Sequence, residues 1–204
     1  MPIIYCQNYT PVSDSIAEIS AQEHQLGLTL LIQGLKNIYD ISLSVRDLDK
    51  YLKRTDSGKP FLSLWPHIHF NISHCSGLAA CVFDSRPVGL DVEMPGYFPE
   101  VLIDRALCPH EKQYLDQPGI SQALREEWFF RFWTLKEAYV KKTGTGVDVP
   151  LKDFSFTFYR DQTGYSVTCS DSRVFCYQTI LKSRHILSVC HEDHTRDIRL
   201  NICP

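Results

Sequence analysis

The chain has 204 residues, 44% of them hydrophobic and 22% charged, and its formal net charge is −3. This length and composition suit one compact domain or two small ones, and they exclude an intrinsically disordered chain. The slight negative charge also argues against a protein that binds the phosphate backbone of nucleic acids over a broad surface.

The first half of the chain begins with a predicted helix over residues 17–38, where apolar side chains recur at about helical spacing. A polar segment follows and ends in "GKP" at residues 58–60, which indicates a loop. In "HIHFNISH", residues 67–74, apolar and polar side chains alternate, so we expect a strand with one polar face. Short turns lead to strands over 78–83 and 88–93, and the three strands predict an antiparallel meander.

The second half returns to helices and then to strands. Two helices are predicted, over residues 99–116 and 121–142. Five strands follow, over residues 153–161, 164–170, 173–180, 184–192 and 197–203. A helix followed by strands thus occurs twice, which predicts an α+β fold with segregated elements and two similar halves. We place the boundary between an N-terminal subdomain, 1–87, and a C-terminal subdomain, 88–204.

The cysteines and the N-terminal segment indicate the cellular compartment of the protein. None of the eight cysteines forms a CxxC pair, and most lie in apolar runs such as "LAACVF", so we expect reduced thiols. The N-terminal segment lacks the charged and apolar regions of a signal peptide, and no run reaches the ~18 apolar residues of a membrane helix. We therefore expect a soluble, cytoplasmic protein that binds no membrane.

Two carboxylates share one face of the strand predicted at 88–93. Asp91 and Glu93 are two residues apart, so both side chains point the same way, and Gly89 on that face leaves room for a ligand. An ordinary solvated strand face is the alternative, because a DxE pair alone is common. The pair lies at a strand end directly before "MPG", where sites often form, so we interpret it as a candidate metal site.

The helix predicted at 121–142 carries a third carboxylate. At about 100° per residue, a core stripe follows one side of this helix, while Glu137 and Lys141 lie on the opposite face beside an aromatic side chain. Because apolar side chains surround nearly the whole helix, we expect Glu137 to be partly covered and to need a partner. Lys141 at i+4 and a metal shared with Asp91 and Glu93 are the two candidate partners.

A site built from these three carboxylates has only oxygen ligands. Mg²⁺ favours such ligands, and it keeps several waters while it binds the phosphates of a substrate. Lysines beside the carboxylates suit a phosphate substrate. Ser73, His74 and Lys59 are each unremarkable on their own, and His67 and His69 share a strand face without an evident third zinc ligand.

Four motifs, in this order along the chain, resemble one protein family. They are "GKP" at 58–60, "FNISH" at 70–74, "GLDVE" at 89–93 and "WTLKEAYVKKTGTG" at 133–146. Together they are similar to 4'-phosphopantetheinyl transferases of the broad-specificity, pseudodimeric type, which move the phosphopantetheine arm of coenzyme A to a carrier-protein serine and release adenosine 3',5'-bisphosphate. The resemblance implies two subdomains related by a pseudo-twofold axis, an active site at the seam between them, and a monomer.

The resemblance implies a role for each residue of the carboxylate and lysine motifs. Asp91, Glu93 and Glu137 would bind Mg²⁺, which also binds the pyrophosphate of coenzyme A. Lys136 and Lys141 would hold the pyrophosphate oxygens, with Lys141 nearest the leaving group. Glu137 would also act as the base for the incoming serine, directly or through a water.

The same resemblance predicts how the nucleotide is held. Ser73 and His74 would contact the adenosine and its 3'-phosphate, and Lys59 and Pro60 would line the adenine pocket. Cys75 stands where the family usually has a serine, which is a mild change.

The predicted first helix departs from the family pattern. Relatives carry basic residues before and within this helix that grip the 3'-phosphate, whereas here His24 is the only candidate before Lys36. Either Lys36 or Arg46 replaces them, or coenzyme A binds more weakly. This departure motivates a first alternative, a homologue that binds coenzyme A or a carrier protein without catalysis.

A Mg²⁺-dependent nuclease or phosphodiesterase is the second alternative. It needs a basic groove for nucleic acid, and the net charge of −3 argues against one. The expected partners are therefore coenzyme A and an apo acyl or peptidyl carrier protein, with no nucleic acid among them.

Overall fold

The computed structural model describes residues 1–146, 149–161, 164–192 and 197–203. Its helices are α1 (Ile16–Tyr39), α2 (Val45–Tyr51), α3 (Val101–Ala106), α4 (Pro109–Lys112) and α5 (Gln122–Thr143). Its strands are β1 (Ile3–Asn8), β2 (Leu52–Arg54), β3 (Pro60–Leu62), β4 (His69–Cys75), β5 (Leu78–Asp84), β6 (Val88–Glu93), β7 (Phe156–Asp161), β8 (Gly164–Cys169), β9 (Phe175–Ile180), β10 (Ile186–His191) and β11 (Arg199–Cys203). The predicted α+β class is confirmed.

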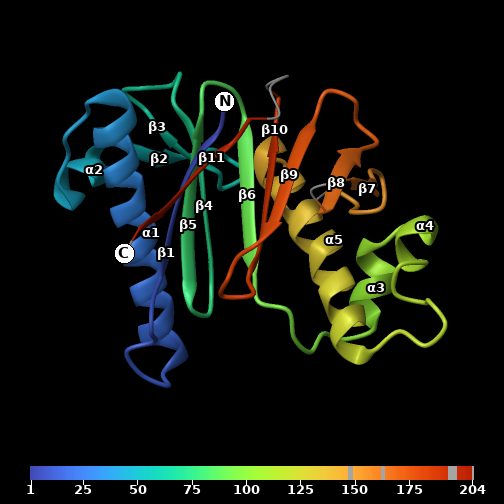
Figure 1. Ribbon diagram of the computed structural model, residues 1–204. Helices are drawn as coiled ribbons and strands as arrows, with labels where there is room; N and C mark the ends of the chain where they lie inside the picture. The colour runs from blue at the N-terminus through green and yellow to red at the C-terminus, as the bar shows by residue number, and fades with distance from the viewer. Residues whose placement is uncertain (147–148, 162–163, 193–196, 204) are drawn as a thin grey trace.

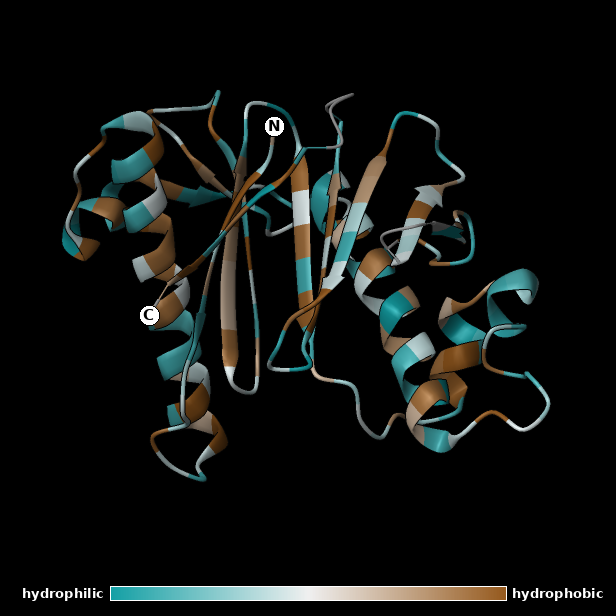
Figure 2. Cartoon of the chain, in the orientation of Figure 1, coloured by the Kyte–Doolittle hydropathy of each residue, from teal (hydrophilic) through white to brown (hydrophobic). Residues whose placement is uncertain are grey.

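Two sheets lie between two long helices (Figure 1). The first sheet has the strand order β11-β1-β5-β4, and the second has the order β6-β10-β9. An apolar layer fills the space between the sheets, with Ile4 and Val82 from the first meeting Leu90 and Val189 from the second. Strand β5 is hydrophobic over almost its whole length in Figure 2, because both of its faces are buried.

Helix α1 covers the outer face of the first sheet. Its side chains Leu30, Leu31 and Leu35 are fully buried there. The helix approaches the sheet so closely that a Cβ at Gly34 would lie 2.1 Å from the ring of Phe83. The bounds of α1 agree with the prediction of a helix over residues 17–38.

Helix α5 covers the outer face of the second sheet and is also packed against α3, α4 and the β7–β8 hairpin. The hydroxyl of Ser121 caps its first turn by accepting a bond from the backbone N–H of Leu124. Gly144 ends it in the left-handed conformation, with φ of +68°. Residues on several sides of α5 are buried, which confirms the prediction that this helix is covered on more than one side.

The predicted three-stranded meander is wrong in its last strand. Strands β4 and β5 pair antiparallel as expected, but β6 pairs with β10 and so begins the second sheet. The helix predicted over 99–116 is also wrong, because the chain forms two short helices there. Pro109 starts the second of them, and a proline disfavours helical backbone in the residue before it.

Sequence patterns missed several short elements of the N-terminal half, namely β1, α2, β2 and β3. Strand β2 pairs with β3 as a small hairpin, which turns at Gly58 with φ of +86°. This hairpin projects "GKP" toward the end of α5, where the side chain of Lys59 meets Gly144.

The division into subdomains 1–87 and 88–204, and the pseudo-twofold axis between them, stay predictions. One strand crosses the proposed boundary, because β11 pairs in parallel with β1 and thereby joins the first sheet. All eight cysteines are free thiols, as expected.

None of the helices in the described ranges combines the length and the apolar character needed to cross a membrane.

Candidate functional site

The edge strands β4 and β6 lie next to each other where the two sheets meet, and we call this line the seam. Side chains of β4 bond the backbone of β6: Asn71 Oδ1 accepts from the N–H of Leu90 at 2.9 Å. Ser73 Oγ likewise accepts from the N–H of Val92 at 3.3 Å. Buried polar side chains therefore hold the two strands together, and they place Ser73 beside Asp91 of β6.

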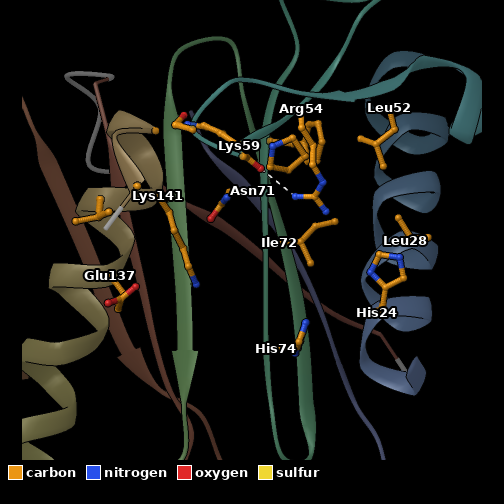
Figure 3. A pocket seen from close by; sticks show the side chains of 17 residues that line it. His24, Leu28, Leu52, Arg54, Lys59, Asn71, Ile72, His74, Glu137 and Lys141 are labelled. Atoms are coloured by element: carbon orange, nitrogen blue, oxygen red, sulfur yellow. Dashed lines mark hydrogen bonds between the residues drawn. The ribbon is translucent and has the colours of Figure 1, made fainter. Parts of the chain in front are cut away.

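A cavity of about 380 Å³ lies over the seam, between α1, the β2–β3 hairpin and α5. Five of the predicted site residues line it, namely Lys59, Pro60, His74, Glu137 and Lys141. Figure 3 shows Glu137 and Lys141 on α5 at one side, His74 on β4 in the middle, and His24 on α1 at the other side. Residues from four separate parts of the sequence thus meet around one cavity.

Asp91 is the buried centre of this site, with only 3% of its surface exposed. Its Oδ1 accepts from Lys141 Nζ at 2.6 Å and from Ser73 Oγ at 2.9 Å, and Lys141 Nζ also donates to Ser73 Oγ at 3.1 Å. Lys141 of α5 is therefore bonded to Asp91 of β6, although its neighbour Glu137 lies on the same helix. The other oxygen, Asp91 Oδ2, is buried without a hydrogen-bond partner among the described residues.

Gly89 explains how α5 comes close enough for that bond. A Cβ at this position would lie 2.0 Å from the carbonyl oxygen of Ala138 and 2.3 Å from the backbone nitrogen of Lys142. The missing side chain therefore makes room for the helix backbone, and the expectation that it leaves room for a ligand is wrong. This close crossing brings Lys141 over Asp91.

Mutual repulsion and burial define the electrostatics of the carboxylates. Burial, followed by the charge of Asp91, raises the pKa of Glu93 to about 7. The same two causes, in the same order, raise the pKa of Glu137. Burial lowers the pKa of Lys141, but the charges of Asp91, Glu137 and Glu93 outweigh it and raise that pKa above its ordinary value. The site therefore holds more negative charge than Lys141 alone neutralises.

The excess negative charge of these carboxylates favours a bound cation. The ligand atoms are hard carboxylate oxygens, and one of them, Asp91 Oδ2, is buried and unpaired in the described structure. Within the described ranges, no three His, Cys, Asp or Glu side chains are grouped closely enough to hold a metal by themselves. The carboxylate donors and the unpaired Asp91 Oδ2 are what fits an ion such as Mg²⁺, which takes part of its shell from water and substrate phosphate.

Comparison with known proteins assigns these motifs to a family. The family model described as the 4'-phosphopantetheinyl transferase superfamily matches residues 87–195, which hold the DxE strand and all of α5. The chain belongs to this superfamily.

Named members of the superfamily extend the likeness beyond the matched segment. The chain is 31% identical over 150 residues to 4'-phosphopantetheinyl transferase Sfp of Bacillus subtilis, covering 70% of this chain and 64% of that protein. It is 30% identical over 121 residues to 4'-phosphopantetheinyl transferase gsp of Aneurinibacillus migulanus, covering 59% of this chain and 49% of that one. The chain thus spans about half to two thirds of the length of these two relatives.

A solved structure is also similar, the holo-[acyl-carrier-protein] synthase of Thermotoga maritima. The TM-score is 0.40 and the identity 21%, with 53% of this chain and 64% of that chain covered.

Lys136 belongs to the helix motif at 133–146 but does not reach the cavity. It is fully buried, and its Nζ lies 3.0 Å from Glu111 Oε2, which is buried as well. It also donates to the carbonyl oxygens of Leu151 at 2.7 Å and Phe154 at 2.6 Å. The expected contact of Lys136 with pyrophosphate is therefore wrong, because its charge is used inside the core to join α5 to α4 and the segment before β7.

Lys59 lines the cavity, but its ammonium group is directed at the end of α5. Its Nζ donates to the carbonyl oxygen of Lys142 at 2.7 Å and lies 3.4 Å from that of Val88. Burial, helped by the charge of Lys142, lowers the pKa of Lys59 to about 8. Lys59 thereby ties the β2–β3 hairpin to α5, while Pro60 and the lysine stem form part of the cavity wall.

The structure also brings Arg54, a cation that the sequence analysis did not single out, to this cavity beside His24. Arg54 and His24 line the cavity, and Arg54 is held by a 2.9 Å bond to the carbonyl oxygen of Gly58 (Figure 3). Lys36 and Arg46, the two candidates proposed from sequence, are exposed and do not line it. The only sequence signal for Arg54 was its position four residues before "GKP", which is meaningful only once the hairpin is known.

Proposed function

We propose that the chain transfers the 4'-phosphopantetheine arm of coenzyme A to a serine of an apo carrier protein and releases adenosine 3',5'-bisphosphate. One observation supports this most strongly. The bonded set of Lys141, Asp91 and Ser73 lies beside Glu137, next to a cavity whose other walls carry Arg54 and His24. Phosphoryl transfer needs this combination of fixed charges and positioned groups more than it needs a covalent intermediate.

Each wall of the cavity suits one part of coenzyme A. The carboxylate side, with Lys141, suits the pyrophosphate, and the side with Arg54 and His24 suits the 3'-phosphate. His74 lines the cavity between these two sides and is proposed to contact the 3'-phosphate as well. Pro60 and the stem of Lys59 offer an apolar wall for the adenine ring.

In the proposed reaction the serine oxygen attacks the phosphorus that bears the pantetheine arm. A bond forms between that oxygen and phosphorus, and the bridging bond to the adenosine-bearing phosphate breaks. Lys141 donates hydrogen bonds to the oxygens that gain charge on the leaving phosphate. Mg²⁺ held by Asp91, Glu93 and Glu137 would supply further neutralisation of the pyrophosphate charge.

The serine proton passes to Glu137, directly or through a water. A buried carboxylate beside another carboxylate binds a proton more readily, and the pKa of Glu137 is raised for these reasons. A proton acceptor with a raised pKa accepts the serine proton more strongly than an ordinary surface carboxylate does. The nucleophile itself comes from the partner, so the chain needs no serine of its own for the chemistry.

The proposed partner is an acyl or peptidyl carrier protein in its apo form, and the proposed working unit is a monomer in the cytoplasm. Two halves in one chain make a monomer sufficient, because the cavity already draws its walls from both of them. The free cysteines fit a reducing compartment.

The proposal is tested by the mass of the carrier. Apo-carriers from fatty-acid, polyketide and peptide synthesis are incubated with coenzyme A, Mg²⁺ and the protein, and the intact carrier mass is measured. We expect a gain of one phosphopantetheine arm, and we expect Asp91→Ala to abolish it while the thermal melt stays cooperative. A wild-type protein that binds coenzyme A but modifies no carrier would instead support the non-catalytic homologue.

A further inference from the structure

Glu23 of α1 lies between two side chains that come from other parts of the chain. One of its carboxylate oxygens is 3.0 Å from His74 Nδ1, and the hydroxyl of Tyr9 donates to the other. Glu23 is largely buried, with 12% of its side chain exposed, whereas His74 has 36% exposed and lines the cavity. The motifs that carry the transferase assignment do not include Glu23 or Tyr9.

The register between α1 and β4 builds this contact. A Cβ at Gly27 would lie 2.7 Å from the side chain of Ile72, so α1 crosses β4 closely at that point. Residues four apart on a helix share a face, as do residues two apart on a strand. One helical turn before Gly27 is Glu23, and two residues after Ile72 is His74, so the crossing places these two side chains together.

Tyr9, which directly follows β1, is the third residue of this cluster with Glu23 and His74, and its backbone holds it in place. The backbone N–H of Tyr9 donates to the carbonyl oxygen of Gly77 at 3.1 Å, which fixes Tyr9 to the β4–β5 turn. Its hydroxyl also lies 3.3 Å from the carbonyl oxygen of Cys75. Burial and the bond to Glu23 raise the pKa of Tyr9 to about 12, so its hydroxyl keeps the proton that it donates.

We propose that Glu23, held by Tyr9, is a positioning residue that fixes the imidazole of His74 for binding the 3'-phosphate of coenzyme A. This inference rests on the proposed function, since that function supplies the ligand. A carboxylate only accepts hydrogen bonds, so the bond to Glu23 requires a proton on His74 Nδ1. The other nitrogen, Nε2, is then the one left to meet a phosphate, and a proton there makes the ring a cationic donor.

Other titratable groups lie near Glu23, His74 and Tyr9. His24 follows Glu23 on α1 and lines the same cavity. Glu93 on β6 and the thiol of Cys75 on β4 are close enough that the charge of Glu23 contributes to the raised pKa of each. Among the described residues, His74 is the histidine whose ring nitrogen meets the carboxylate of Glu23, at 3.0 Å.

The first experiment measures steady-state transfer with coenzyme A and with 3'-dephospho-coenzyme A. For Glu23→Ala we expect KM for coenzyme A to rise about tenfold, which corresponds to the loss of one charge-assisted bond, while kcat stays within about twofold. KM for the dephospho substrate should hardly change. Glu23→Gln keeps an acceptor oxygen and should recover part of the affinity, and Tyr9→Phe should show a smaller loss.

Two controls separate positioning from a general structural effect. Glu18→Gln changes an exposed carboxylate on the same helix and should leave both substrates unaffected. In a His74→Ala background, Glu23→Ala should have no further effect on KM, because the two residues act through one contact. An equal loss for both substrates, or a full additional loss in the His74→Ala background, would overturn the inference.

A measurement on the protein without substrate tests the role of Glu23 independently of the proposed function. The imidazole ¹⁵N signals of His74, assigned by comparison with His74→Gln, should show a protonated Nδ1 in the wild type. They should show a mixture of tautomers in Glu23→Ala. If the wild-type protein transfers nothing, the proposed function fails, and these signals still decide whether Glu23 positions His74. Unchanged signals in Glu23→Ala would refute it.

Discussion

Replacing Gly89 by alanine should damage the proposed catalytic site without touching any of its side chains. The added Cβ would lie 2.0 Å from the carbonyl oxygen of Ala138 and 2.3 Å from the backbone nitrogen of Lys142, whereas ordinary contacts begin near 3.4 Å. Both obstacles are helix backbone, so α5 has to move away from β6 by more than an ångström. That movement pulls Lys141 away from Asp91, whose present separation is 2.6 Å.

The expected size of this effect follows from the same geometry. Overpacking a core costs about 1–3 kcal/mol, and a backbone obstacle places this case near the upper value. For a chain of this length, ~3 kcal/mol lowers the melting temperature by roughly 6–12 °C. A displacement of about one ångström at a catalytic group costs on the order of a hundredfold in rate, so kcat should fall by that factor while the protein remains folded.

Differential scanning calorimetry and the carrier modification assay, both applied to Gly89→Ala, test these two expectations. Gly96→Ala is the matched control, because the nearest atom to its new Cβ is the carbonyl oxygen of Met94 at 4.0 Å. It should change the melting temperature by no more than about 2 °C. Wild-type stability and wild-type transfer in Gly89→Ala would refute the close crossing of α5 over β6.

Three further predictions concern single charges. Lys136→Met leaves Glu111 buried without its ammonium partner and should lower the free energy of unfolding in urea by about 3–5 kcal/mol, which Glu111→Gln in the same chain should partly restore. The pKa of Lys59 is lowered to about 8, so between pH 8 and 10.5 the unfolded chain binds more protons than the folded one. The free energy of unfolding of the wild type, relative to Lys59→Met, should therefore rise by roughly 1–2 kcal/mol across that pH range. A difference between the two proteins that does not change with pH would contradict this. Asp91→Asn should slow transfer about a thousandfold at a Mg²⁺ concentration that saturates the wild type, and a wild-type rate with an unchanged Mg²⁺ dependence would contradict the proposed ligand role.

Local patterns predicted the long helices well, because their ends are encoded nearby. Ser121 and Gly144 mark the two ends of α5 by capping, and apolar spacing predicted its length. The same spacing placed Glu137 and Lys141 on one face, and both line the cavity. The order of four short motifs then indicated the family before any distance was known.

What the sequence could not predict depends on how distant segments pack. A short turn after β5 is compatible with a third strand in the same sheet and with a crossing to another sheet, and only the pairing of β6 with β10 decides between them. Lys136 belongs to the same motif as Lys141, yet one faces the core and the other faces Asp91. The contact between Glu23 and His74 depends on the crossing of α1 over β4.

The most direct test of the proposed function follows both products in one reaction. The protein is incubated with coenzyme A, Mg²⁺ and an apo-carrier, and holo-carrier and adenosine 3',5'-bisphosphate are measured together over time. We predict that the two appear in equal amounts and that neither forms when the carrier serine is replaced by alanine. Release of the nucleotide without carrier modification would show a phosphodiesterase and contradict the transferase proposal.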